Sequence, residues 1–320
     1  RCDGIAIFLR QRGLEAELID NDAIKGGGHA DDVLNDQRFT ELYDRIRAGE
    51  FVAIFAAPPC STYSVARFIT PRDGREGAPP VRDRMNMDGL KVVPPGHQRE
   101  LRRANKVTAR TVALLHAGAS VGAEIIMENP ADRGNEDVPH LYEEPRHGPI
   151  WLVPEVKALQ RKHHLLSCTF PMCQFGGDFQ KYTTLLFSRG FESWLVPLDK
   201  MKCSHPANAH KPAGGTQCPD GEWTSREAAA YPAEFNLNIA EIMLKLVVSA
   251  SMTHVAHDVQ PVAITNGGTQ EERLAAGQRI LAAGGSAALA SHAVSRGIDA
   301  DGNVRGSPHD KPSELSPAPA

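Results

Sequence analysis

The sequence lacks the features that mark several simple protein classes. Six cysteines in 320 residues are too few for a disulfide-bonded scaffold. There is no excess of positive charge, because 35 Lys and Arg stand against 39 Asp and Glu, for a formal net charge of −4. This balance excludes a protein that holds nucleic acid mainly by bulk charge. A hydrophobic fraction of 41% excludes a wholly disordered chain.

Long apolar runs, a secretory leader pattern and internal repeats are also missing. No apolar run approaches the roughly 18 residues that span a bilayer. We therefore expect no membrane partner and an intracellular location, in the nucleus of a eukaryote or the cytoplasm of a bacterium or phage-infected cell. The first residue is Arg1 rather than Met, so we expect a fragment of a larger protein or mobile element. The sequence carries no signal of the oligomeric state.

What is present is an alternation of helical and strand patterns in the first half of the chain. Apolar residues at helical spacing alternate with short apolar runs that end at acidic residues or prolines. This rhythm is typical of an open α/β sheet. The predicted helices are residues 4–13, 38–48, 103–119 and 232–247, and the predicted strands are residues 14–20, 51–57 and 124–127.

Composition divides the chain into three parts. Residues 1–187 carry the α/β pattern, and residues 188–250 form a small subdomain with a closing helix. Residues 251–320 are rich in Ala, Gly, Ser and Pro, which predicts a low-complexity and largely disordered tail.

Polar residues follow three of the predicted strands directly. They are Asp20, the segment 58–61 with Cys60 at its centre, and the segment 128–130 that begins with Glu128. Ligands of open α/β sheets bind beyond the carboxyl ends of the strands, so these groups are expected to converge. Each has a plainer interpretation by itself: a buried structural thiol for Cys60, and solvated turn acids for Glu128 and Asp20.

Three segments together resemble the C5-cytosine DNA methyltransferase family. They are AAPPCSTYS at 56–64, IIMENP at 125–130 and CQFGGDFQKYTTLLFS at 173–188. The third is similar to the variant of phage-type methylases, and the resemblance extends over residues 1–248. It implies a Rossmann-like sheet that binds S-adenosylmethionine, with a small C-terminal subdomain. The family's first strand and Gly-rich cofactor loop would lie upstream of Cys2, so we expect an N-terminally truncated member.

The resemblance also implies a mechanism on DNA. The thiolate of Cys60 would add to C6 of a flipped-out cytosine, Glu128 would hold the N3 and N4 edge, and C5 would take the methyl group. By the same analogy, Asp20 would bind the ribose of the cofactor and Asp32 would bind the amino group of its adenine. The remaining implied residues are Pro58 at the cofactor and Ser61, Asn129, Gln180 and Lys181 at the nucleic acid.

Two other interpretations of the chain stay open. One is a degenerate domain of the same fold that binds nucleic acid without catalysis. The other is an unrelated α/β enzyme in which Cys60 acts with a histidine base such as His97 or His116.

A cysteine and histidine cluster follows the resembling region. Cys203, His205, His210 and Cys218 are of the residue types that bind zinc, although their spacing matches no standard finger. A polar loop with locally packed side chains is the alternative, and Cys168 and Cys173 are expected to be core or surface residues instead.

Basic residues gather after Cys60 although the net charge is negative. A basic lip there would suit phosphate contacts, and a solvated loop is the alternative. The residues are Arg67, Arg72, Arg75, Arg82, Arg84, Arg99, Arg102, Arg103 and Lys106.

Overall fold

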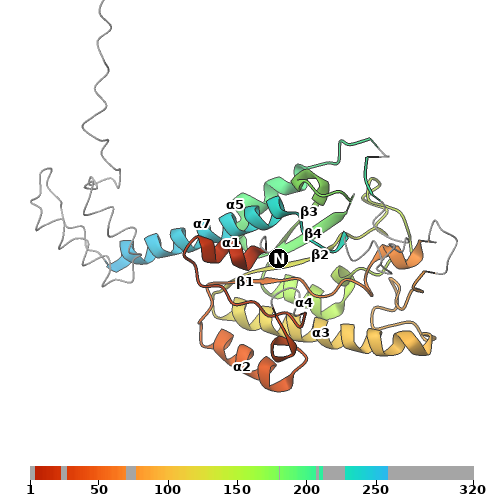
Figure 1. Ribbon diagram of the computed structural model, residues 1–320, viewed down its shortest axis with the longest axis horizontal. Coiled ribbons are helices and arrows are strands. Elements are labelled where there is room, and N and C mark those ends of the chain that lie inside the picture. The colour runs from red at the N-terminus through yellow and green to blue at the C-terminus, as the bar shows by residue number, and fades with distance from the viewer. Residues whose placement is uncertain are drawn as a thin grey trace, which may run out of the picture. The chain divides into compact units, whose positions relative to one another are not determined.

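A computed structural model describes most of the first 258 residues (Figure 1). Side chains are described up to residue 249. Gln180, Cys218, Arg72, Arg75 and the predicted tail beyond residue 258 lie outside the described residues. The chain divides after Leu244 into two compact units, and the contacts reported below lie in the first. The described ranges are 4–22, 27–69, 77–179, 181–206, 209–211 and 228–258.

The centre of the first unit is a mixed four-stranded sheet with the order β1-β2-β4-β3. β1 and β2 are parallel, whereas β4 is antiparallel to both of its neighbours, β2 and β3. The carboxyl ends of β1 and β2 therefore lie at the same sheet edge as the start of β4. The strands are β1 (Ala53–Ala56), β2 (Glu124–Pro130), β3 (Leu166–Pro171) and β4 (Tyr182–Phe187).

Two of the strands follow directly from their sequences. β2 contains Ile125, Ile126 and Met127, all at most 1% exposed, as expected for a strand covered on both faces. β1 stops before Pro58 and Pro59, which cannot donate a backbone hydrogen bond to a ladder. The predicted α/β class is confirmed, with a sheet that is mixed.

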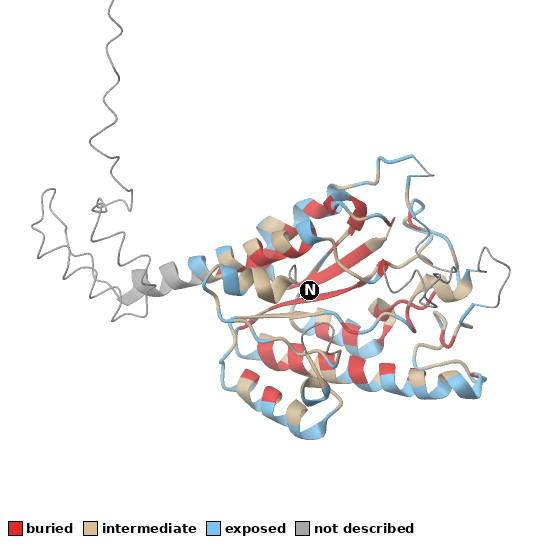
Figure 2. Cartoon of the chain, viewed as in Figure 1, coloured by how far each residue is buried: buried red, intermediate tan, exposed pale blue. Residues whose placement is uncertain are grey.

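Helices cover both faces of the sheet (Figures 1 and 2). On one face Leu115 of α3 and Val156 and Leu159 of α4 pack against Ile125 and Leu186. On the other face Phe235 of α7 packs against Phe170 of β3, with ring centroids 6.0 Å apart. The helices concerned are α3 (Pro95–Ser120), α4 (Pro154–Lys162) and α7 (Ala233–Asp258).

Helix α2 (Asp36–Arg47) packs outside α3 through Leu42 and Ile46, and Asn35 caps its start by accepting from the amides of Gln37 and Arg38. The shorter helices are α1 (Ile5–Gln11) and α5 (Glu192–Leu195).

The predicted strand at 14–20 is wrong, because these residues are irregular. No described strand lies beside them to complete a ladder. Instead, Arg10 donates to the carbonyl of Ala16, and Glu17 forms ion pairs with Arg38 and Arg45 of α2. The alternation of apolar and acidic residues here serves packing and ion pairs on α2, which gives the same pattern as a half-buried strand.

Candidate functional site

The candidate site lies at the sheet edge where β1 and β2 end. Ala56, the last residue of β1, pairs with Met127, the residue before Glu128. The rigid Pro58-Pro59 pair then leads to Cys60, which is half-buried and not disulfide-bonded. The parallel pairing thus brings the loop that carries Cys60 and the carboxylate of Glu128 to one edge, as the sequence predicted.

Glu128 is a buried carboxylate with three partners. It is 3% exposed. Thr183 donates a hydrogen bond to its Oε1 and Tyr231 donates one to its Oε2, while Lys181 Nζ lies 3.7 Å from Oε1. A buried charge persists only when it is paired and hydrogen-bonded, and these three groups supply both conditions. The turn-acid alternative for Glu128 is therefore wrong.

Tyr231 connects the elements of the site. Its ring packs edge-on against Phe55 of β1 and lies 5.0 Å from the ring of Phe235 in α7. Burial raises the pKa of Tyr231, and the negative charge of Glu128, the hydrogen bond to it and the neighbouring Cys60 raise it further. The phenol therefore remains a proton donor at neutral pH, close to both candidate catalytic residues.

Sequence reasoning missed Tyr231 and Thr183. Thr183 belongs to β4, whose antiparallel course places it opposite Pro130. Tyr231 stands just before α7, 103 residues from Glu128. An aromatic residue directly before a helix and its proline carries no functional signal by itself. The position of Tyr231 became informative only when the sheet order and the place of α7 were known.

Asn129 and Pro58 are in contact with each other. Asn129 is 1% exposed, and its Nδ2 donates to the Pro58 carbonyl at 2.9 Å. Its Oδ1 is buried and has no hydrogen-bond partner among the described residues. The contact holds the exit of β1 against the end of β2, so both residues position the loop before Cys60.

The loop after Cys60 is anchored by Arg82, which is 2% exposed. Its guanidinium donates to the Thr62 carbonyl and hydroxyl at 3.1 and 2.9 Å, to Asn105 at 2.9 Å and to the Met87 carbonyl at 2.5 Å. It also lies 3.8 Å from the centroid of the Tyr63 ring. Burial lowers the pKa of Arg82. The expectation that Arg82 belongs to a phosphate-binding lip is wrong.

Other basic residues of the predicted lip are engaged within the protein. Arg67 donates to the Ser61 carbonyl at 2.6 Å and to Glu100 at 2.5 Å. Arg84 forms a two-point pair with Asp132 at 2.8 and 2.9 Å. Arg103 and Lys106 pair with acids before or in α2, whereas Arg99 and Arg102 are exposed on α3.

Asp32 and Ser61 are attached to adjacent turns of α3. Asp32 pairs with Arg103 at 3.0 Å, and Ser61 donates to Glu100 at 3.0 Å. These helix residues are three apart, a rise of about 4.5 Å. Burial by itself would raise the pKa of Asp32, but the Leu34 amide and the charge of Arg103 lower it.

Asn21, the residue after Asp20, contacts Asp32: its Nδ2 is 3.5 Å from Asp32 Oδ2. The Asp20 side chain accepts from the amide of Asp22 at 2.9 Å. The loop that carries these two carboxylates and the loop that carries Cys60 therefore meet the same part of α3.

The histidines considered as bases for Cys60 have other contacts. His97 Nδ1 lies 3.2 Å from Glu100, and His116 Nδ1 lies 2.7 Å from His163 Nε2. Burial lowers the pKa of His116, and the charges of Lys162 and Arg47 lower it further.

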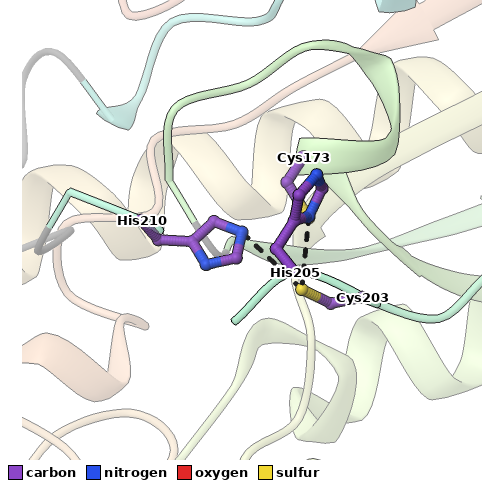
Figure 3. Close-up of side chains that lie close together, drawn as sticks. All are labelled: Cys173, Cys203, His205 and His210. Atoms are coloured by element: carbon purple, nitrogen blue, oxygen red, sulfur yellow. Dashed lines mark hydrogen bonds between the residues drawn. The ribbon is translucent and has the colours of Figure 1, made fainter. Parts of the chain in front are cut away.

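A second cluster joins Cys173, Cys203, His205 and His210 (Figure 3). The four ligand atoms lie within 4.8 Å of one another, so the cluster could hold a metal ion. Three members match the prediction. Cys218 lies outside the described residues. Cys173 is buried, as a core residue would be, and its thiol is also the fourth member of this cluster.

No helix in the described ranges is long and apolar enough to cross a membrane.

Comparisons of this chain with family models, with curated proteins and with solved structures gave no match.

Proposed function

We propose that the chain is a Rossmann-like methyltransferase domain that methylates cytosine in DNA at C5. The observation that carries this proposal is the sheet edge at which the loop of Cys60 meets the buried carboxylate of Glu128. Addition to a pyrimidine ring requires a nucleophile and a hydrogen-bonding carboxylate near each other, and here they stand in the loop after β1 and near the end of the parallel strand β2. The sequence motifs around both residues supply the family to which this geometry is assigned.

Cys60 would act as the nucleophile. Its thiolate adds to cytosine C6, and the electron pair of the C5–C6 bond becomes available at C5. C5 then attacks the methyl group of a sulfonium donor, whose bond to that methyl group breaks so that the donor leaves as a neutral thioether. Loss of the C5 proton to solvent or a base restores the double bond as the bond between the Cys60 sulfur and C6 breaks. The thiolate is thereby regenerated. The rigid prolines before Cys60 hold its backbone in place for this attack.

Glu128 would recognise the base. A carboxylate has about four lone-pair positions, and Thr183, Tyr231 and Lys181 occupy only part of them. A remaining position can accept from the cytosine N4 amino group. Burial strengthens this hydrogen bond, because little water competes for the carboxylate. Tyr231 and Thr183 would fix the orientation of the carboxylate before the base arrives.

The cofactor implied by this chemistry is S-adenosylmethionine, which supplies an electrophilic methyl group when bound. The described residues suit its adenosine half. Asp20 and Asp32 provide hydrogen-bond acceptors for ribose hydroxyls and an amino group, and their loop meets α3 one turn from Ser61. Binding there would place the cofactor beside the loop that carries Cys60.

DNA is the proposed partner, and the target base must leave its stack to reach a buried carboxylate. Flipping a base costs a few kcal/mol, which contacts with phosphates can offset. Arg99 and Arg102 are exposed on α3 and are candidates for such contacts. Ser61 is exposed next to Cys60 and would lie near the flipped nucleotide.

The test is covalent trapping on duplex DNA that contains 5-fluorocytosine in several sequence contexts, with S-adenosylmethionine present. Fluorine at C5 cannot leave as the proton does, so the adduct persists. We expect an adduct on a denaturing gel that Cys60→Ala abolishes. Cys168→Ala is the matched control, since burial, together with the charge of Asp199, raises the pKa of the Cys168 thiol to about 12.

The absence of an adduct in folded protein would overturn the catalytic proposal. DNA binding by fluorescence anisotropy without an adduct would then favour the degenerate nucleic-acid-binding domain. Thioester hydrolysis that depends on Cys60, without any DNA binding, would favour the unrelated enzyme. An adduct that persists in Cys60→Ala and disappears in Cys168→Ala would show that Cys168 of β3 is the nucleophile and would refute the role proposed for Cys60.

A further inference from the structure

We propose that Cys173, Cys203, His205 and His210 bind one zinc ion, and that this ion holds the start of β4 in place. The evidence for the metal site does not depend on the proposed methyl transfer, because none of its ligands is a residue assigned to that reaction. The proposal rests on the convergence of four ligand atoms, on their chemical types and on the contacts of the segments that carry them.

The distances fit a tetrahedral zinc site. Zinc binds sulfur at about 2.3 Å and imidazole nitrogen at about 2.0–2.1 Å, which places a sulfur and a nitrogen ligand about 3.6 Å apart across a tetrahedral edge. Cys203 Sγ lies 3.7 Å from His205 Nδ1 and 3.6 Å from His210 Nε2. All separations in the cluster are within 4.8 Å, so binding requires a contraction of at most about 1 Å.

The ligand types select the metal. Two thiolates and two imidazoles form a common structural zinc set, whereas Mg²⁺ and Ca²⁺ prefer oxygen ligands. Four protein ligands fill a tetrahedral site and leave no open position for a substrate, which favours a structural ion over a catalytic one. Cys173 is buried, Cys203 and His210 are half-buried and His205 is exposed. The site is therefore at the surface and accessible to an incoming ion.

The ligands come from two separate segments of the chain. Cys173 belongs to the 3-10 turn Met172–Phe175, which leads from β3 toward β4. The other three lie between residues 203 and 210, beyond the turn Val196–Lys200. A metal ion bound to both segments closes a loop of about 30 residues and so restricts the unfolded chain as a cross-link does.

Both segments contact the start of β4. The Cys203 amide donates to the Tyr182 hydroxyl at 3.3 Å. The Met172 amide, next to Cys173, donates to the Lys181 carbonyl at 2.8 Å. Lys181 and Thr183, on either side of Tyr182, are the residues that contact Glu128. An ion that fixes Cys173 and Cys203 would thereby fix the part of β4 that supports the carboxylate.

The first measurement is the metal content of the full chain purified without added chelator. We expect one zinc per chain by mass spectrometry of the metal, and strong loss in Cys173→Ser and Cys203→Ser. Cys168→Ser is the matched control and should retain the ion, because Cys168 is not part of the cluster. Replacement of zinc by Co²⁺ should give the visible bands of a tetrahedral site with thiolate charge transfer, and Cys203→Ser should abolish them.

A second comparison decides the ligand set. Cys218→Ser should keep the zinc, while Cys173→Ser should lose it. The reverse result would overturn the assignment of Cys173 as a ligand. Folded wild-type protein without bound zinc after zinc reconstitution would overturn the metal site. A disulfide between Cys173 and Cys203 that persists in protein purified under reducing conditions would overturn it as well.

The link to β4 has its own readout, which needs no activity. Removal of zinc should increase hydrogen exchange at the amides of residues 181–183 and leave β1 unchanged. If exchange at those amides is the same with and without zinc, the ion does not support β4. Failure of the DNA adduct in zinc-loaded protein would contradict the proposed function and leave the metal site standing.

Discussion

Tyr231→Phe provides the sharpest test of the carboxylate network. The substitution removes the hydroxyl that donates to Glu128 and keeps the ring that packs against Phe55 and Phe235. A hydrogen bond to a charged group contributes about 1.5–3 kcal/mol, and a partner left buried costs a similar amount. We therefore expect the free energy of unfolding to fall by about 2 kcal/mol, which lowers Tm by roughly 4–8 °C for a domain of this size.

The assay is urea unfolding followed by tryptophan fluorescence, with Tyr142→Phe as the control. The Tyr142 hydroxyl also donates to a carboxylate, that of Glu136, at 3.2 Å, but this tyrosine is 37% exposed. Exposed contacts of this kind contribute little, so the control should leave the urea midpoint nearly unchanged. Equal effects of the two substitutions would refute the importance of burial at Glu128.

The pH dependence of the same pair gives a second check. Burial, and after it the negative charge of Glu128, raises the pKa of Tyr231 above its ordinary value. A raised folded-state pKa means that the folded form keeps its proton where the unfolded chain loses it, near pH 10. The stability advantage of wild type over Tyr231→Phe should therefore be complete below pH 10 and shrink as pH rises above it. A difference that is constant to pH 10.5 would contradict this assignment.

Three further outcomes follow from the contacts around the site. Arg82→Met should lower the free energy of unfolding by about 2–4 kcal/mol, because it leaves several buried acceptors without a donor. The control Arg99→Met, at an exposed position, should leave the urea midpoint unchanged. Asn129→Ala should cost about 1–2 kcal/mol by removing the donor to Pro58, and should slow formation of the DNA adduct. Asp132→Asn should cost about 1 kcal/mol at pH 7 after solvent screening is allowed for. Burial alone would raise the pKa of Asp132, but hydrogen bonds from His147 and Arg84 lower it. This cost should therefore be complete above the ordinary Asp pKa of about 4 and shrink progressively as pH falls below it in acid-unfolding curves.

The part of the fold that sequence patterns revealed is the part built from local signals. β1 and β2 are apolar runs ended by polar or proline residues, and their parallel pairing follows from the helix between them. Helix α3 begins at Pro95, eight residues before its predicted start. The prediction began too late because residues 95–102 contain a single apolar residue suited to a core, Leu101, and so show no apolar periodicity. The strand predicted at 14–20 failed because a strand needs a neighbour that its own sequence does not identify.

The candidate site was predictable to the same extent. Cys60 and Glu128 could be paired by the rule that parallel strands end at one edge. Tyr231 and Cys173 could not be found in this way, since each joins its partners through segments distant in the sequence. Spacing suggested Cys218 as a fourth member because it continues the local run, and Cys218 lies outside the described residues. Among the described residues the fourth member of the cluster is Cys173, in the turn after β3.

The separation between Glu128 and its donors has a consequence for synthesis on the ribosome. Thr183 lies 55 residues and Tyr231 lies 103 residues after Glu128. The carboxylate therefore leaves the ribosome long before the two hydroxyls that donate to it have been synthesised. Contacts of such long range form late, because the intervening chain must first be ordered. We expect nascent chains that end before Tyr231 to keep Glu128 in water and leave the sheet edge open. A pause in translation ahead of α7 would therefore delay completion of the site rather than formation of the sheet.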